Sequence, residues 1–349
     1  MKIVCWNLLN LAASILNKPF TAAFTPYGMG NTVMDYIVNL VAGMNNPATN
    51  VPVWDFATQN VSQNPADIFV IIELRTGGRI KGNAVSANCN NTLVTLVTAL
   101  NTAMVTRNLQ ATYHYNYATS LITGNRESVG VIYNDIVFNQ MTTVTQTLRN
   151  NNGQNLLPRT PMQVSLTELA TGNVFEVNGL HAPPVRGGQA LRYRPPIDYL
   201  NSLSTVTELD PTVNMTPPEY GYMIMGDYNC SPLSSYTNGM GQIIQAFGNL
   251  NNWGYLTRIP NGTKSSYRIR LNNALPPPDN YLSEAYDNLA YHFTFNTTQG
   301  PFGGVLDLLG GARNSNVNPA VSAYIPQPVA LLNNSRKVSD HQPMVLEFQ

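Results

Sequence analysis

The sequence predicts an α/β protein of the α+β type, a four-layer α/β/β/α sandwich in which two mixed β-sheets pack face to face between flanking helices. Strand-like apolar segments recur along the whole 349-residue chain. Segments with apolar residues at helical spacing are interleaved with them. No internal repeat or linker divides the sequence. Two packed sheets covered by helices would bury all of these apolar faces, so we expect one domain over residues 1–349.

The first part of the chain alternates strand and helix patterns. Residues 3–9 (IVCWNLL) are expected to form the first strand. The run DIFVIIEL at 67–74 follows Pro65 and is nearly continuous in apolar residues, which is typical of a strand buried on both faces. Residues 92–108 repeat Leu, Val and Met at helical spacing, with Thr92 as the candidate N-cap.

The rest of the chain is richer in strands. Its β-rich segments are partly alternating and are separated by Asn/Gly turns, a pattern that predicts strands. These strands are expected at residues 111–118, 128–134, 136–148, 161–169, 174–181, 220–229, 253–259, 288–295 and 343–348. Helices are expected among them at 188–209 and 236–248.

The composition predicts a packed protein with a neutral, amide-rich surface. Hydrophobic residues are 43% of the chain, charged residues only 11%, and the formal net charge is +0. No global basic field exists to attract nucleic acid, so any attraction must come from local arginines or a bound cation. No apolar run approaches the ~18 residues of a membrane span, and the N-terminus is a poor signal peptide. We expect a location in the cytoplasm or export without a classical signal.

Polar side chains stand at the ends of the apolar strands. Asn7, Glu73 and His181 each end one, and Asp227 with Asn229 follows another. Asp287 directly precedes the strand expected at 288–295, and Asp340 and His341 precede the strand expected at 343–348. A carboxylate within an apolar strand costs several kcal/mol unless it is paired or bound to metal. The sequence therefore predicts one shared polar cleft between the two sheets.

These residue types suit phosphodiester cleavage. Such a reaction needs a divalent cation to neutralise the phosphate, a base to activate water, and an acid to assist the leaving oxygen. Oxygen ligands such as Glu73 and Asp340 suit Mg²⁺, Mn²⁺ or Ca²⁺ and not zinc. Two of the four histidines, His181 and His341, fall in the strand-end segments and could serve as base and acid.

The order of these segments resembles a known family. In sequence they are WNLLN (6–10), IIELR (71–75), RESVGVIYN (126–134), GLHAPP (179–184), GDYNC (226–230), YDNLAY (286–291) and SDHQP (339–343). This set is similar to the endonuclease/exonuclease/phosphatase superfamily, and in style to its deoxyribonuclease I-like branch. The spacing departs from the family over about residues 11–66, where we expect a long insertion with helices near 31–44 and 53–63.

The resemblance implies a role for each matched position. Glu73 would be the main metal ligand, with Asn7 and Asp340 completing the metal environment. Asp227 would orient the attacking water, and Asn229 would hold a phosphate oxygen.

The resemblance also implies two carboxylate–histidine pairs, His341 with Asp287 and His181 with Glu127. In this branch such pairs supply the general acid and the general base. Each carboxylate would fix the tautomer of its imidazole and raise its pKa. The sequence does not decide which histidine is the acid.

Arginines follow His181 along the chain. Arg186 and Arg192 could make bidentate contacts to phosphate, although a solvated loop explains them equally well.

The resulting expectation is a monomeric, Mg²⁺-dependent phosphodiester hydrolase, with Mn²⁺ or Ca²⁺ as alternatives, that acts as an endonuclease on DNA. One alternative is a phosphatase or phosphodiesterase acting on inositol phosphates or sphingomyelin-type lipids, which a membrane-binding apolar hairpin would favour, but the sequence shows no clear hairpin of this kind. Another is an inactive binding module of the same fold, against which the intact Glu73, Asp227 and His341 argue.

Overall fold

The computed structural model places the expected elements on one two-sheet framework. It describes residues 1–20, 31–42, 64–77, 87–117, 127–145, 161–186, 188, 191–204, 220–231, 234–246, 254–255, 265–266, 270, 274, 283–284, 286–298, 302–305 and 336–349. The helix expected near 53–63 lies outside these residues.

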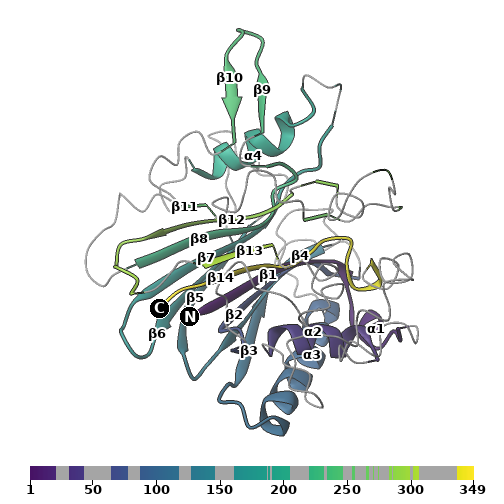
Figure 1. Cartoon of the computed structure of the whole chain (residues 1–349), viewed down its shortest axis with the longest axis vertical. Coiled ribbons are helices and arrows are strands. Elements are labelled where there is room, and N and C mark those ends of the chain that lie inside the picture. Colours follow the sequence, from purple (N-terminus) through teal and green to yellow (C-terminus); the bar gives the residue numbers. More distant parts are fainter. Residues whose placement is uncertain are drawn as a thin grey trace.

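Two six-stranded sheets form the centre of the molecule (Figure 1). The first has the order β13-β14-β1-β2-β4-β3 and consists of β1 (Lys2–Leu11), β2 (Ile68–Arg75), β3 (Tyr113–Tyr117), β4 (Glu127–Asn134), β13 (Phe302–Val305) and β14 (Met344–Glu347). The second has the order β11-β12-β8-β7-β6-β5 and consists of β5 (Phe138–Thr145), β6 (Met162–Glu168), β7 (Val174–His181), β8 (Tyr220–Asp227), β11 (Gly254–Tyr255) and β12 (Asp287–Phe293).

Each sheet has a central parallel pair between antiparallel neighbours. β1 runs parallel to β2, and β7 runs parallel to β8. β4 is antiparallel to β2, and β12 is antiparallel to β8. The ends of the four parallel strands therefore lie at the same edge as the starts of β4 and β12. The strand-end polar residues predicted from the sequence gather at this edge.

Three apolar clusters hold the layers together. The cluster between the sheets joins side chains such as Val70 and Val131 of the first sheet to Val164 and Val177 of the second. Helices α1 (Ala13–Leu16), α2 (Val33–Val41) and α3 (Ala87–Thr106) pack on the outer face of the first sheet. Helix α4 (Arg194–Ser204) packs on the outer face of the second sheet. The predicted four-layer sandwich is confirmed.

The two ends of the described chain meet at the centre of this framework. β1 pairs with β14, and the Met1 ammonium donates to the Phe348 carbonyl at 2.5 Å. The Phe348 amide donates back to the Met1 carbonyl at 3.0 Å. Figure 1 shows N and C side by side. Among the described residues, no helix is both long and apolar enough to cross a membrane.

The helix expected at 236–248 is wrong over the described residues 236–246, which belong to a hairpin of β9 (Ser235–Thr237) and β10 (Ile243–Gln245). Asn238 Oδ1 accepts hydrogen bonds from the amides of Met240 and Gln242, at 3.0 and 2.9 Å. Gly241 has a φ of 78°, which glycine adopts without a steric penalty. The Asn-Gly-Met-Gly segment therefore makes a tight turn where a helix would need continuous backbone hydrogen bonds.

Thr92 is not an N-cap, because α3 begins five residues earlier, at Ala87. The Thr92 hydroxyl instead donates to the Asn88 carbonyl at 2.7 Å and accepts from the Ala13 amide at 3.0 Å. The residue therefore ties α3 to α1 from the helix interior.

Candidate active site

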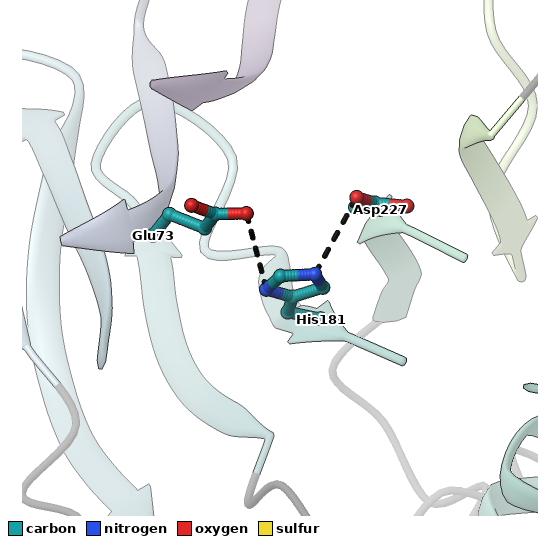
Figure 2. A group of neighbouring side chains, drawn as sticks. All are labelled: Glu73, His181 and Asp227. Atoms are coloured by element: carbon teal, nitrogen blue, oxygen red, sulfur yellow. Dashed lines mark ion pairs between the residues drawn. The ribbon is translucent and has the colours of Figure 1, made fainter. Parts of the chain in front are cut away.

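The edge where the central strands end brings residues of both sheets together. Asn7 lies on β1 and Glu73 on β2 of the first sheet, while His181 and Asp227 end β7 and β8 of the second. His181 and Asp227 are register partners across the parallel β7–β8 pair. Figure 2 shows the imidazole of His181 between the carboxylates of Glu73 and Asp227. These four side chains, two from each sheet, therefore meet at this edge.

Asn7 connects the two sheets at this point. Its Nδ2 donates to Glu73 Oε1 and to Asp227 Oδ2, at 3.1 Å in each case. Its Oδ1 accepts from the Leu9 amide at 3.1 Å. In this orientation the Asn7 side chain donates to both carboxylates, and its oxygen accepts from the backbone two residues further on.

Glu73 lies in a crowded acidic environment. Burial raises the pKa of its carboxyl above the usual range; His181 opposes this, whereas Glu127 and Asp227 add to it. Asn10, which the sequence reasoning did not single out, donates to Glu73 Oε2 from both its backbone amide and Nδ2, at 3.2 Å each.

His181 lies among three carboxylates. Its Nδ1 is 3.3 Å from Glu127 Oε1 and 3.7 Å from Glu73 Oε1. Its Nε2 is 3.5 Å from Asp227 Oδ2. The structure therefore places His181 beside Glu127, the carboxylate to which the motif order matched it.

His341 is held by a short contact to a buried carboxylate. Its Nδ1 is 2.6 Å from Asp287 Oδ2, and its Nε2 is 3.7 Å from Asp227 Oδ2 and 3.8 Å from Asp340 Oδ1. Burial alone would lower the pKa of His341, but Asp287, Asp227 and then Asp340 raise it to about 10. His341 is therefore an imidazolium at neutral pH in the metal-free protein.

Buried hydrogen bonds also hold the backbone of His341 and of its partner Asp287 in place. The His341 amide donates to Ser339 Oγ at 2.9 Å, and the Ser339 hydroxyl donates to the Asn7 carbonyl. The indole Nε1 of Trp6 donates to the His341 carbonyl at 2.8 Å. The Asp287 amide donates to Ser265 Oγ at 2.9 Å. Ser339 and Ser265 thus support the site, although the sequence did not identify them. Serine is too common a residue to be recognised as a site residue from the sequence alone.

Asn229 and Asp227 form a turn directly after β8. The Asn229 amide donates to Asp227 Oδ1 at 2.8 Å, and Asn229 has a φ of 52°. Its Nδ2 donates to the Ala182 carbonyl at 2.8 Å. This turn fixes the Asp227 carboxylate and links the segment after β7 to the segment after β8.

The two arginines predicted to contact phosphate, Arg186 and Arg192, lie near the segment that precedes Asp287. Arg186 is exposed, and its amide donates to the Arg192 carbonyl at 3.1 Å. The Arg192 guanidinium is 3.5 Å from Glu284 Oε1 and donates to the Tyr286 hydroxyl at 3.3 Å. Since Tyr286 directly precedes Asp287, Arg192 is anchored next to the segment that carries the partner of His341.

The residues present fit a divalent cation. Five carboxylates, those of Glu73, Glu127, Asp227, Asp287 and Asp340, lie within 3.8 Å of the two imidazoles. Ligand atoms of Glu73, His181 and Asp227 lie within 4.8 Å of one another. Asp340 Oδ1 is buried and accepts no hydrogen bond from the described residues.

Comparison with known proteins finds similarity at the level of structure. No protein-family model matches the sequence, and no curated protein is similar to it. The structure is similar to the catalytic domain of human Nocturnin (12% identity, covering 100% of this chain and 94% of that one, TM-score 0.43). It is also similar to a mannosyl-6-phosphatase of Bacteroides thetaiotaomicron (14% identity, 100% and 99%, TM-score 0.47).

A third similar structure, also from Bacteroides thetaiotaomicron, is described as an endonuclease/exonuclease/phosphatase family protein (13% identity, 100% and 94%, TM-score 0.47). This is the family that the order of sequence motifs resembles. Because the identities are low and the TM-scores lie below 0.5, the chemistry proposed for this site rests on its own residues.

Proposed function

We propose that the protein is a divalent-metal-dependent phosphodiester hydrolase that cleaves DNA internally. One observation carries the proposal: the Nε2 atoms of two imidazoles lie 3.5 and 3.7 Å from the same oxygen, Asp227 Oδ2, and a carboxylate oxygen lies 3.3 Å from Nδ1 of His181 and 2.6 Å from Nδ1 of His341. Two such imidazoles facing one point can serve as the base and acid that phosphodiester hydrolysis requires. The motif order from Asn7 to His341 supports DNA as the substrate.

The cation would be held by oxygen atoms of Glu73 and Asp340, with Asn7 completing its surroundings, and such ligands suit Mg²⁺. When bound there, it would neutralise the phosphate and stabilise the charge of the pentacovalent transition state. Asn7 donates to both Glu73 and Asp227, and so keeps the metal-binding carboxylate and the water-orienting carboxylate in position.

The two imidazoles have different surroundings, which suggests different roles. His341 is kept protonated by Asp287 and Asp227, so it can donate a proton to the leaving oxygen. His181 is 3.7 Å from Glu73, the carboxylate proposed to hold the cation, where it can accept a proton from the attacking water. We therefore assign His341 as the general acid and His181 as the general base, with Asp227 orienting the water between them.

The proposal is tested with supercoiled plasmid DNA, incubated with Mg²⁺ or with EDTA. The wild-type protein should nick the plasmid only with Mg²⁺. Glu73→Gln and His341→Ala should each lower the rate by ~10²–10⁴. His114→Ala is the matched control, because His114 pairs with the exposed Asp135. Folded wild-type protein that leaves the plasmid intact would contradict the DNA assignment.

A second candidate is a phosphodiesterase acting on lipids, and the β9–β10 hairpin favours it. In Figure 1 the hairpin projects beyond α4, away from the two sheets. Met240 is 80% exposed and Ile243 70%, and residues 235–246 contain no charged side chain. A protruding, uncharged hairpin with apolar side chains suits contact with a lipid surface.

Hydrolysis of sphingomyelin in phosphatidylcholine vesicles distinguishes the two candidates. For a lipid phosphodiesterase, the double variant Met240→Ser with Ile243→Ser should lower vesicle hydrolysis and leave cleavage of a soluble phosphodiester unchanged. For a DNA endonuclease, plasmid nicking should exceed vesicle hydrolysis in the wild-type protein. Equal vesicle hydrolysis by the wild type and the double variant would remove the hairpin as support for the lipid candidate.

A further inference from the structure

The part of β1 that follows Asn7 departs from regular strand geometry beside Glu73. Pairing with β2 is regular up to Asn7 and Ile72, and it resumes at Leu11 and Leu74. Three residues of β1 therefore face the single residue Glu73, which makes this an enlarged β-bulge. Bulges beside active sites commonly change the direction in which a side chain points.

The backbone on both sides of this bulge lies in the left-handed region. Leu9, Asn10 and Glu73 have φ values of 42°, 59° and 64°. This conformation is strained for a non-glycine residue, although a short polar side chain such as that of asparagine eases it. Other interactions must therefore hold the three residues in place.

Asn10 supplies those interactions. Its backbone amide and its Nδ2 both donate to Glu73 Oε2, at 3.2 Å each. The other oxygen, Glu73 Oε1, accepts one hydrogen bond within the described residues, from Asn7 Nδ2 at 3.1 Å, and lies 3.7 Å from His181 Nδ1, beyond hydrogen-bond distance. A carboxylate offers about four lone-pair positions, two on each oxygen. The two donors of Asn10 therefore fill Oε2, whereas Oε1 keeps a position for another partner.

We propose that Asn10 is a positioning residue that fixes the Glu73 carboxylate so that Oε1, and not Oε2, faces the bound cation. The inference rests on the proposed metal-dependent function. Asn10 is exposed, and its side-chain amide donates to Glu73. It acts on the cation only through that carboxylate.

The test separates the amide of Asn10 from its backbone conformation. Asn10→Gly removes the side-chain donor and keeps the left-handed backbone, which glycine adopts without strain. Asn108→Gly is the matched control, because Asn108 is also an exposed asparagine with a φ of 54° and lies after α3. Mn²⁺ binding to the whole chain is measured by titration calorimetry without substrate.

Loss of a group that orients a metal ligand typically weakens metal binding 10–100-fold. We expect the Kd for Mn²⁺ to rise about 10-fold in Asn10→Gly and to stay within about twofold of the wild type in Asn108→Gly. Thermal unfolding in EDTA should show both variants folded. Equal Mn²⁺ affinity in Asn10→Gly and the wild type would overturn the role of Asn10. Absence of Mn²⁺ binding in the wild type would instead overturn the proposed function.

Discussion

At the scale of single residues, the site depends on how a buried imidazole keeps its charge. His341 is buried, yet three carboxylates lie within 3.8 Å of its ring nitrogens. Together they outweigh burial and bring its pKa to about 10. The histidine is therefore a proton donor under conditions where a solvated imidazole is mostly neutral.

Removing the charge of Asp287 should lower the pKa of His341 in the metal-free protein, because Asp287 makes the largest favourable contribution to the imidazolium. NMR titration of the His341 ring resonance in EDTA measures this. The wild-type resonance should stay protonated to about pH 10, whereas Asp287→Asn should titrate clearly lower. Asp135→Asn, which alters an exposed pair with His114, should leave His341 unchanged. Identical titrations in the wild type and Asp287→Asn would show that Asp287 does not hold the charge.

Strand-end placement made part of this site predictable. His181 and Asp227 end β7 and β8, Asn7 and Glu73 lie in the last halves of β1 and β2, and parallel strands that run together end at one edge. The contacts of Asn10 could not be predicted in this way, because they arise from a bulge that the residue pattern of β1 does not reveal. The catalytic roles themselves remain predictions.

At the scale of elements, the close approach of β7 and β8 depends on one glycine. Gly226 directly precedes Asp227 and has a φ of 145°. A Cβ at this position would lie 1.9 Å from the Leu180 carbonyl oxygen, which is backbone and cannot rotate away. The strand pair that positions His181 and Asp227 therefore requires glycine here.

Gly226→Ala should destabilise the protein by ~3 kcal/mol or more, because overpacking adds to backbone strain. Gly172→Ala is the comparison, since Gly172 has a φ of 78° but nothing within 4 Å of an added Cβ. It should cost only the ~1–2 kcal/mol of the left-handed conformation. Urea unfolding measures both. Equal losses would mean that β7 and β8 can separate without cost.

The first strand carries a lysine that gives the protein a pH-dependent stability. Burial lowers the pKa of Lys2 from 10.5 to about 8, although Glu347 and Asp67 oppose this. Between these values the unfolded chain binds more protons than the folded one, so the free energy of unfolding rises with pH from about 8 to about 10.5. Below this window Lys2 destabilises the fold, by ~3 kcal/mol for a shift of this size.

Lys2→Met should abolish this contribution. Relative to the variant, the wild-type free energy of unfolding should increase from pH 8 to pH 10.5, by an amount on the order of 3 kcal/mol. Urea unfolding of both proteins across that range measures the difference in their free energies of unfolding. Tyrosine and cysteine residues titrate in both proteins, so their contributions cancel in this difference. A difference that does not change with pH would mean that the Lys2 ammonium is not desolvated.

Elements with a strong pattern were predictable, whereas the hairpin was not. The nearly continuous apolar run of β2 permits little except a buried strand. Residues 236–248 contain apolar side chains at spacings that also fit a helix, and the outcome is decided by the Asn238 side chain bonding its own turn. Hydrogen bonds between a side chain and its own turn compete with the backbone hydrogen bonds of a helix, and they leave no periodic pattern in the sequence.

At the scale of the whole molecule, the site belongs to both sheets and is a property of the folded chain only. If Mg²⁺ binds only the folded state, it should stabilise the protein by ~2.7 kcal/mol at a concentration 100 times its Kd. Thermal unfolding with Mg²⁺ and with EDTA should show a higher Tm with Mg²⁺ in the wild type and not in Glu73→Gln. An equal Tm rise in both proteins would place the ion elsewhere.

The pairing of β1 with β14 also determines when the site can come into existence. Asn7 and His341 are more than 300 residues apart in the sequence, with Asn7 coming first. Until His341 has been synthesised, the Asp287 carboxylate lacks its partner, and β1 lacks the neighbour that completes its sheet. A chain that stops before His341 therefore lacks both the partner of Asp287 and the neighbour of β1, so this site cannot assemble in it.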